Sequence, residues 1–150
     1  MIVALQNGAE VAPAIESERT FLNWEEAAAM LKGGMSIGSH THTHPVLQRL
    51  PLEEQCAELA RSKQLLEERL HTEVISLAYP VGGPAAYSRS TMDAAKELGY
   101  RAAFSYRSGF NYPGQTNHYE IRRNAVDSDT TLSRFRLQLA CGAMSGRYSI

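Results

Sequence analysis

The sequence predicts an α/β fold with a largely parallel sheet or barrel, and two observations support this class. Helical patterns alternate with short apolar runs, as in chains whose strands are joined by right-handed helical crossovers. The apolar runs end in Gly- and Pro-containing turns, which is typical of buried parallel strands. No internal repeat, low-complexity tract or linker divides the 150 residues. We therefore expect one domain over residues 1–150.

The beginning of the chain predicts a strand, a helix and a second strand. The first strand is expected over residues 2–5. Asn23 and Glu26 predict a capping box for a helix over residues 24–32, because each side chain can accept the other residue's backbone N–H. Residues 35–38 then predict a short strand that leads into a histidine-rich segment.

The helix expected over residues 52–70 has the most regular pattern in the chain. Pro51 suits its start, where an N–H would have no helical acceptor. Apolar residues at helical spacing predict its buried face: Leu52, Cys56, Leu59, Leu66 and Leu70. The remaining sequence predicts a strand over residues 74–79, a helix over 90–98, strands over 100–104 and 119–126, and a helix over 130–140 capped by Asp129.

Composition and charge exclude several functions. The formal net charge is −1 and no Lys/Arg cluster is interleaved with aromatic residues, so we expect no nucleic-acid partner. No run approaches the ~20 apolar residues that span a bilayer. The N-terminus lacks the basic segment of a signal peptide, so the chain as written is expected in the cytoplasm, while its compartment stays open.

Three of the five histidines, His40, His42 and His44, fall within one short segment. Neutral imidazole is the commonest nitrogen ligand for zinc and similar ions. Histidines four apart share one side of a helical turn, and residues two apart share one face of a strand, so either geometry can place two of them on one ion. We expect His40 and His44 to be these ligands and His42 to point away. The alternative is a polar loop whose histidines only form hydrogen bonds.

The segment GSHTHTHP, residues 38–45, resembles the second conserved motif of the polysaccharide deacetylases, His-(Ser/Thr)-x-x-His-(Pro/Ser). These proteins are also called NodB-homology or carbohydrate esterase family four enzymes. The segment ISLAYPVGG, residues 75–83, stands where their third motif, Arg-x-Pro-(Tyr/Trp)-Gly, is expected. The resemblance covers roughly residues 20–126, and the order of the two motifs carries it. It implies a distorted (β/α) barrel of the NodB type.

The resemblance implies a hydrolase that removes acetyl groups from N- or O-acetylated polysaccharide. His40 and His44 would bind a divalent metal, zinc in the first place with cobalt or nickel as alternatives, and an aspartate would complete the site. Water activated by the metal would attack the acetyl carbonyl. The backbone N–H of Val81 would stabilise the resulting oxyanion. The residues implied to bind substrate are Tyr79, Pro80, Val81 and Arg123. The alternatives are a turn that only closes a strand, for residues 79–81, and a surface arginine, for Arg123.

The sequence departs from the family pattern in four places. Val81 stands where the third motif has Tyr or Trp, which keeps the backbone donor but would alter the wall that packs against the sugar. Ala78 stands where many members carry arginine, a variant shared by a subgroup. The first family motif, Thr-Phe-Asp-Asp, supplies the general base and a metal ligand, but this chain has no Asp-Asp pair and its first aspartate is Asp93. The late Leu-x-His motif is not recognisable either, so no catalytic acid or base is assigned. We expect a domain truncated at its N-terminus, with a divergent domain as the alternative.

Two further functions compete with catalysis. A catalytically incomplete domain could keep the fold and bind carbohydrate or a partner, and a metal could serve a structural or regulatory role. A barrel that lacks a strand would also leave an open edge, which a second copy of the chain could cover as a homo-oligomer.

Overall fold

The structure is a computed structural model that describes residues 21–141. The chain divides into two compact units, residues 1–37 and 38–150. The described part of the first unit contains α1 (Trp24–Lys32). Asn23 Oδ1 accepts the Glu26 N–H at 2.7 Å, and Glu26 Oε2 accepts the Asn23 N–H at 2.8 Å. The predicted capping box is therefore confirmed, whereas the strand predicted over residues 2–5 lies outside the described residues.

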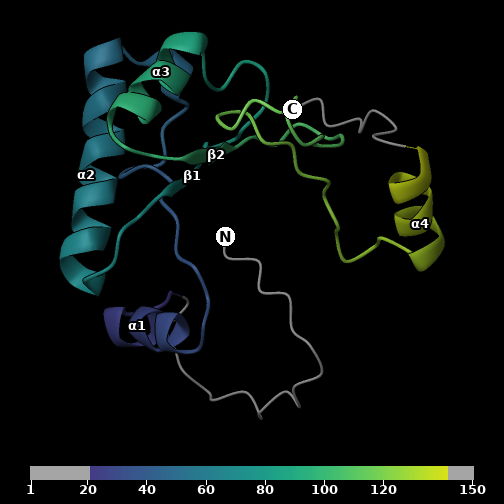
Figure 1. The fold of residues 1–150 in the computed structure, drawn as a ribbon, viewed down its shortest axis with the longest axis horizontal. Helices are drawn as coiled ribbons and strands as arrows, with labels where there is room; N and C mark the ends of the chain where they lie inside the picture. Colours follow the sequence, from purple (N-terminus) through teal and green to yellow (C-terminus); the bar gives the residue numbers. More distant parts are fainter. Residues whose placement is uncertain (1–20, 142–150) are drawn as a thin grey trace. The chain divides into compact units, whose positions relative to one another are not determined.

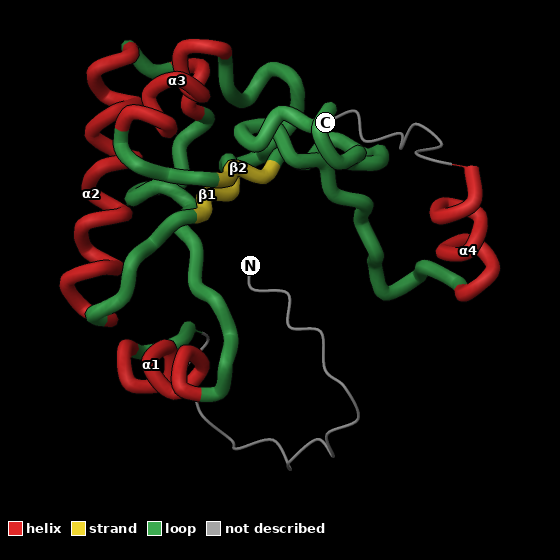
Figure 2. Tube along the Cα trace, in the orientation of Figure 1, coloured by secondary structure: helices red, strands yellow, loops and turns green. Residues whose placement is uncertain are grey.

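The second unit is built around a short parallel sheet, drawn as yellow segments in Figure 2. Strands β1 (Ser76–Ala78) and β2 (Ala102–Phe104) pair in parallel, with Ser76 opposite Ala102. A single parallel bridge extends this ladder on each side, from Ser39 to Leu77 and from Phe104 to Ile121. Four chain segments thus run side by side in their sequence order, which confirms the predicted parallel α/β class.

The strands predicted over residues 35–38 and 119–126 are wrong, because their place is taken by these single bridges at Ser39 and Ile121. The Met35 N–H instead donates to Met30 O and closes the turn after α1. In the later segment, the Tyr119 N–H donates to a side chain, Asn117 Oδ1, at 3.0 Å. Backbone donors that are used locally cannot continue a strand ladder.

Helices α2 (Leu52–Leu70) and α3 (Arg89–Glu97) lie side by side next to β1 and β2 (Figure 1). The bounds of α2 agree with the prediction. Helix α3 begins one residue before the predicted start and is capped by Ser88, whose side chain accepts the Thr91 N–H. A 3-10 turn, η1 (Leu47–Arg49), precedes α2.

The C-terminal helix, α4 (Leu132–Cys141), forms where it was predicted. Its expected cap is wrong: Thr131 Oγ1, and not Asp129, accepts the Arg134 N–H, at 3.2 Å. Asp129 instead lies 3.7 Å from the Arg134 guanidinium as an exposed ion pair. Among the described helices, none is long and apolar enough to cross a membrane.

The core lies where α2 and α3 meet one face of the sheet. Leu59 and the two central strand residues, Leu77 and Ala103, are fully buried there. The predicted apolar face of α2 is wrong at Leu52, which is 48% exposed. The buried cluster consists of Leu47, Leu59, Val74, Leu77, Tyr79, Ala86, Tyr87, Ala94, Ala95, Tyr100 and Ala103.

Two polar side chains of α2 are buried with partners from other elements. Gln55 Oε1 accepts a hydrogen bond from Thr91 of α3 at 2.6 Å. Ser62 Oγ accepts one from Ser39 Oγ at 2.9 Å. Burial of these groups is tolerated because each hydrogen bond replaces one lost to water. They tie α2 both to α3 and to the bridge residue that precedes the histidine segment.

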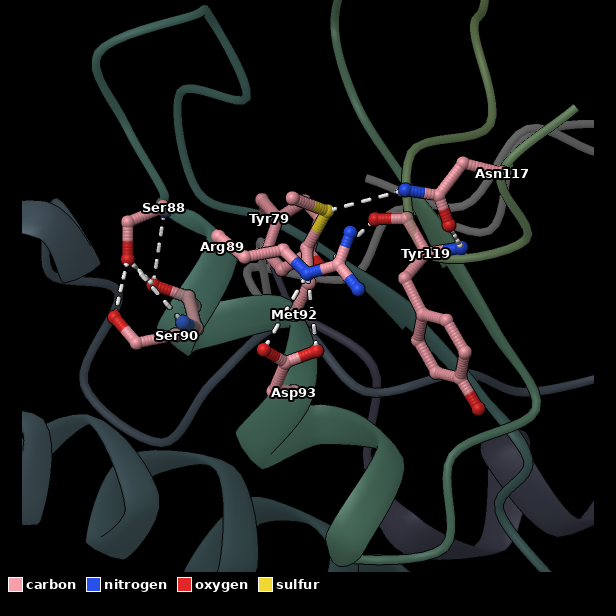
Figure 3. A network of polar contacts seen from close by, with 9 residues as sticks. Tyr79, Ser88, Arg89, Ser90, Met92, Asp93, Asn117 and Tyr119 are labelled. Atoms are coloured by element: carbon pink, nitrogen blue, oxygen red, sulfur yellow. Dashed lines mark hydrogen bonds and ion pairs between the residues drawn. The ribbon is translucent and has the colours of Figure 1, made fainter.

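The segment that follows β2 is also linked to α3, as Figure 3 shows. Asn117 Nδ2 lies 3.5 Å from Met92 Sδ, while Arg89 pairs with Asp93 one turn further along α3 at 3.2 Å. Asp93, the first aspartate of the chain, therefore forms an exposed ion pair with Arg89 of the same helix. This agrees with its expected role as a solvated surface residue.

Candidate functional site

The residues selected from the sequence follow neighbouring segments of the parallel ladder. His40 comes directly after the bridge residue Ser39, and Tyr79 comes directly after β1. Arg123 follows the bridge residue Ile121 by two positions. The carboxyl ends of parallel strands lie at one edge of a sheet, which is where α/β proteins place their sites. The ladder therefore brings the histidines, the Tyr79 turn and Arg123 to one edge.

His40 is half-buried, and its ring orientation is fixed by the end of β1. Its Nδ1 lies 2.7 Å from Ala78 O. Because a carbonyl oxygen can only accept, Nδ1 carries the proton and Nε2 of the neutral ring presents its lone pair. Burial lowers the pKa of His40, and the charges of His44 and Arg123 lower it further, against the opposing effect of the Ala78 hydrogen bond. The neutral, metal-ligating form is favoured.

The rings of His40 and His44 lie together, with centroids 4.8 Å apart and planes at 76°. His44 is exposed, and its N–H donates to Thr41 Oγ1 at 3.1 Å. Both Thr41 and His44 have left-handed backbone angles, with φ of 64° and 63°. The chain therefore turns tightly between the two rings. His42, between them, is exposed and outside this ring pair.

The turn that follows β1 holds Val81 in an unusual backbone conformation. Gly82 N–H donates to Pro80 O at 2.6 Å, which closes a γ-turn centred on Val81 with a φ of 61°. Gly82 is required next, because a Cβ there would lie 2.7 Å from the Tyr106 nitrogen. Among the hydrogen bonds recorded for residues 21–141, none uses the Val81 N–H. This donor stays available at the edge of the sheet.

The side chains of the turn are divided between core and solvent. Val81 is 56% exposed, whereas Tyr79 is 1% exposed and Pro80 is buried. The Tyr79 ring stacks on Tyr87 with centroids 4.2 Å apart, and its hydroxyl donates to Tyr119 O at 3.0 Å. Of the three turn residues expected to bind substrate, Val81 alone presents its side chain to solvent.

Arg123 is half-buried beside the end of β2. Its Nε donates to Ser105 O at 2.8 Å, and its guanidinium carbon lies 6.0 Å from the centre of the Tyr106 ring. Burial lowers the pKa of Arg123, and its charge in turn acts on His40. The arginine is thus fixed within electrostatic range of the histidine pair.

The histidine pair could provide two nitrogen ligands to a divalent ion. The Ala78 carbonyl bonds Nδ1 of His40 and leaves Nε2 to face a metal, and the His44 ring lies beside the His40 ring. Across the part of the chain that the structure describes, no three His, Cys, Asp or Glu side chains gather into a metal site. Since catalytic zinc usually has three protein ligands, the described residues offer at most two of them.

Two site residues were not found from the sequence. Glu58 of α2 contacts the histidine segment, residues 40–44, at His42 and Thr43. Ser62 of the same helix contacts Ser39, directly before this segment. Glu58 lies among several other glutamates of this helix, so its type and spacing gave no signal. Ser62 carries a small polar side chain at a buried position, which helical periodicity does not distinguish.

Comparisons with known proteins agree with the fold and the motifs. The family described as polysaccharide deacetylase matches residues 7–103. The Bacillus subtilis (strain 168) protein YxkH, named as a polysaccharide deacetylase, is 34% identical to this chain over 88 residues. Its match covers 59% of this chain and 30% of YxkH.

Two solved structures share the fold. A Streptococcus pyogenes deacetylase, PplD, determined in complex with acetate, is 24% identical with a TM-score of 0.69. A polysaccharide deacetylase from Bacillus cereus is 27% identical with a TM-score of 0.67. Each match covers 77% of this chain, but 49% of the first structure and 35% of the second. The described α/β arrangement is therefore part of the distorted barrel of these deacetylases, and the chain spans less than half the length of these relatives.

Proposed function

Because the chain belongs to the polysaccharide deacetylase family, we propose that it forms part of a metal-dependent hydrolase that removes acetyl groups from N- or O-acetylated polysaccharide. The observation that carries this proposal is the histidine pair. Two rings 4.8 Å apart, one of them with its tautomer set by Ala78 O, offer nitrogen ligands at the edge of a parallel sheet.

The histidines have distinct roles in this proposal. A divalent ion, zinc with cobalt or nickel as alternatives, would supply Lewis acidity that lowers the pKa of water and polarises an acetyl carbonyl. His40 would bind through Nε2 while its Nδ1–H stays on Ala78 O, a support that orients a ligand ring. His44 would bind from the exposed side. The third ligand and the catalytic acid and base are not assigned to residues of this chain.

The Tyr79–Gly82 turn would recognise the acetyl group. The Val81 N–H would donate to the carbonyl oxygen as negative charge develops there. Its exposed side chain would contact the sugar, while buried Tyr79 and Pro80 hold the turn in place. Arg123, near His40, would add positive charge to the same region. In this proposal Val81 and Arg123 would contact the substrate, and Tyr79 and Pro80 would support the turn.

The competing function is a catalytically incomplete domain that binds carbohydrate or a partner. Two observations favour it: the sequence has no Asp-Asp pair, and residues 21–141 bring no third ligand to the histidines. Under this alternative, glycan binding would survive the loss of both histidines.

The test combines metal binding, acetate release and glycan binding. Zinc and cobalt affinities are measured for the chain, for His40→Ala and His44→Ala, and for His118→Ala, an exposed histidine outside the ring pair. We expect binding to be lost in the first two variants and kept in the third. Acetate release from N-acetylated chitin oligomers is then measured with the metal-loaded chain.

The outcomes separate the alternatives. Unchanged metal affinity in both histidine variants would contradict the proposed site. A folded, metal-loaded chain that releases no acetate, yet binds the oligomers with or without its histidines, would support the incomplete binding domain.

A further inference from the structure

The segment between the two histidines has a backbone that needs support from outside. Thr41 and His44 have φ of 64° and 63°, in the left-handed region that residues with a Cβ rarely adopt. In that region the Cβ lies too close to the following carbonyl oxygen, so each of the two residues is strained. The segment is also exposed from His42 to His44, so it has little packing to hold it. Other contacts must therefore fix the distance between the rings.

The side chain of Glu58 supplies these contacts. Its Oε2 accepts the N–H groups of His42 and Thr43 at 2.8 and 2.7 Å, and its Oε1 accepts the Thr43 hydroxyl at 2.8 Å. All three are charge-assisted hydrogen bonds, which are about twice as strong as neutral ones. One carboxylate oxygen thus binds two backbone N–H groups between the two histidines, and the other binds the Thr43 side chain.

Glu58 acts from a rigid element. It lies in the middle of α2, next to Leu59, which is fully buried, and Gln55, which is 5% exposed. Ser62, one helical turn further, bonds to Ser39 on the other side of His40. Residues four apart on a helix share one face. One face of α2 therefore holds the chain both before and after His40.

We propose that Glu58 is a positioning residue whose carboxylate fixes the His42–Thr43 backbone and, through it, the separation of the His40 and His44 rings. Glu58 does not act as a metal ligand, because its oxygens are occupied by the segment itself. The consequence for metal binding rests on the function proposed above. The consequence for ring geometry does not.

The test compares Glu58→Ala and Glu58→Gln with Glu54→Ala, which removes an exposed carboxylate one turn earlier on α2. We expect the zinc and cobalt affinities to fall about 10- to 100-fold in Glu58→Ala, the range typical of lost outer supports of metal ligands. Glu58→Gln, which keeps one acceptor oxygen, should lie between the other two. Glu54→Ala should match the wild type, and circular dichroism should show equal helix content in all.

A metal-independent measurement keeps the inference separate from the proposed function. In the full chain, NMR should show a contact between the His40 and His44 ring protons, together with slow hydrogen exchange at the His42 and Thr43 amides. We expect both to be lost in Glu58→Ala and kept in Glu54→Ala. Should the wild type bind no metal, the proposed function fails while these signals still decide the positioning role.

Two results would overturn the inference. The first is a Glu58→Ala variant that keeps the ring contact and the protected amides. The second is a metal affinity that falls only in proportion to the unfolded fraction, as a purely structural residue would give. Where Glu58→Ala does not fold, the same measurements on Glu58→Gln decide.

Discussion

The histidine segment, residues 40–44, and the Tyr79–Gly82 turn lie at the same edge of the sheet but are held in opposite ways. Polar contacts hold the histidine segment, through Glu58 and Thr41, and its residues from His42 to His44 are exposed. The core holds the turn, through the buried ring of Tyr79. In the proposed function, the first loop would provide side chains for metal binding and the second would provide a backbone N–H.

This difference separates stability from function. A side chain on an exposed, polar loop can be replaced without opening the core. Its loss should therefore lower the metal affinity and leave the free energy of unfolding nearly unchanged. A turn anchored by a buried aromatic ring cannot be changed in the same way.

Tyr79→Ala should destabilise the chain by about 3–5 kcal/mol, because it removes a 1% exposed ring from the core and leaves a cavity. His44→Ala should change the free energy of unfolding by at most about 0.5 kcal/mol, as expected for an exposed residue. Urea unfolding followed by circular dichroism measures both values. Similar losses in the two variants would remove the distinction between the loops.

Alkaline pH should weaken the tyrosine core. Burial raises the pKa of Tyr87 and Tyr100 to about 12, and it raises that of Tyr79 as well. Unfolded tyrosines ionise near pH 10, so between pH 10 and about 12 the unfolded chain binds fewer protons than the native chain. The free energy of unfolding is therefore unaffected by these groups below pH 10 and falls as pH rises above it.

The control for this prediction uses two tyrosines. Tyr87→Phe should make the alkaline loss shallower, while Tyr112→Phe, at a side chain that is 57% exposed, should leave it unchanged. Unfolding curves at several pH values from 9 upward provide the measurement. Identical pH profiles for Tyr87→Phe and the wild type would show that this tyrosine does not couple ionisation to folding.

The comparison also explains what the sequence could reveal. The bounds of α2 and the capping box of α1 were predicted correctly, because helical periodicity and capping are local properties. The strand over residues 119–126 was not, because its backbone donors are taken by partners such as Asn111, whose side chain accepts the Arg122 N–H and whose approach is known only after folding. Pairing between distant segments is a tertiary property.

The site divides in the same manner. The paired histidines were visible because their chemistry is in their side chains, and the structure places their rings 4.8 Å apart. The Ala78 carbonyl at His40 and the positive φ of Val81 are backbone features, which the residue types Ala and Val do not predict. Glu58 was missed because a carboxylate on a helix surface has the same sequence appearance whether it faces water or a loop. Tyr79 was expected at the substrate, but its ring lies in the core.

Thr41→Val tests the polar support of the histidine segment on its own. The variant keeps the shape of a buried, β-branched residue but removes the acceptor of the His44 N–H. We expect a loss of about 0.5–1.5 kcal/mol in stability and about tenfold in metal affinity. Thr41→Ser, which restores the acceptor, should recover the affinity. A Thr41→Ser variant as weak as Thr41→Val would show that shape, and not the hydrogen bond, supports the segment.

Val81→Gly should produce the smallest effect, and in the opposite direction. Valine at a φ of 61° is strained by about 1–2 kcal/mol, which glycine relieves. Glycine also makes the unfolded chain more flexible, at a cost of about 0.5–1 kcal/mol, so the net gain should be about 0–1.5 kcal/mol. Acetate release, where the chain supports it, should persist because the backbone N–H remains.

Val126→Gly is the matched control, since Val126 is 62% exposed and lies outside the set of non-glycine residues with positive φ. It gains the flexibility without relieving strain and should therefore lose stability. Equal losses in the two variants would mean that the γ-turn stores no strain. A stabilised Val81→Gly that retains acetate release would show that the turn needs only its backbone N–H, and that the Val81 side chain is dispensable for the chemistry.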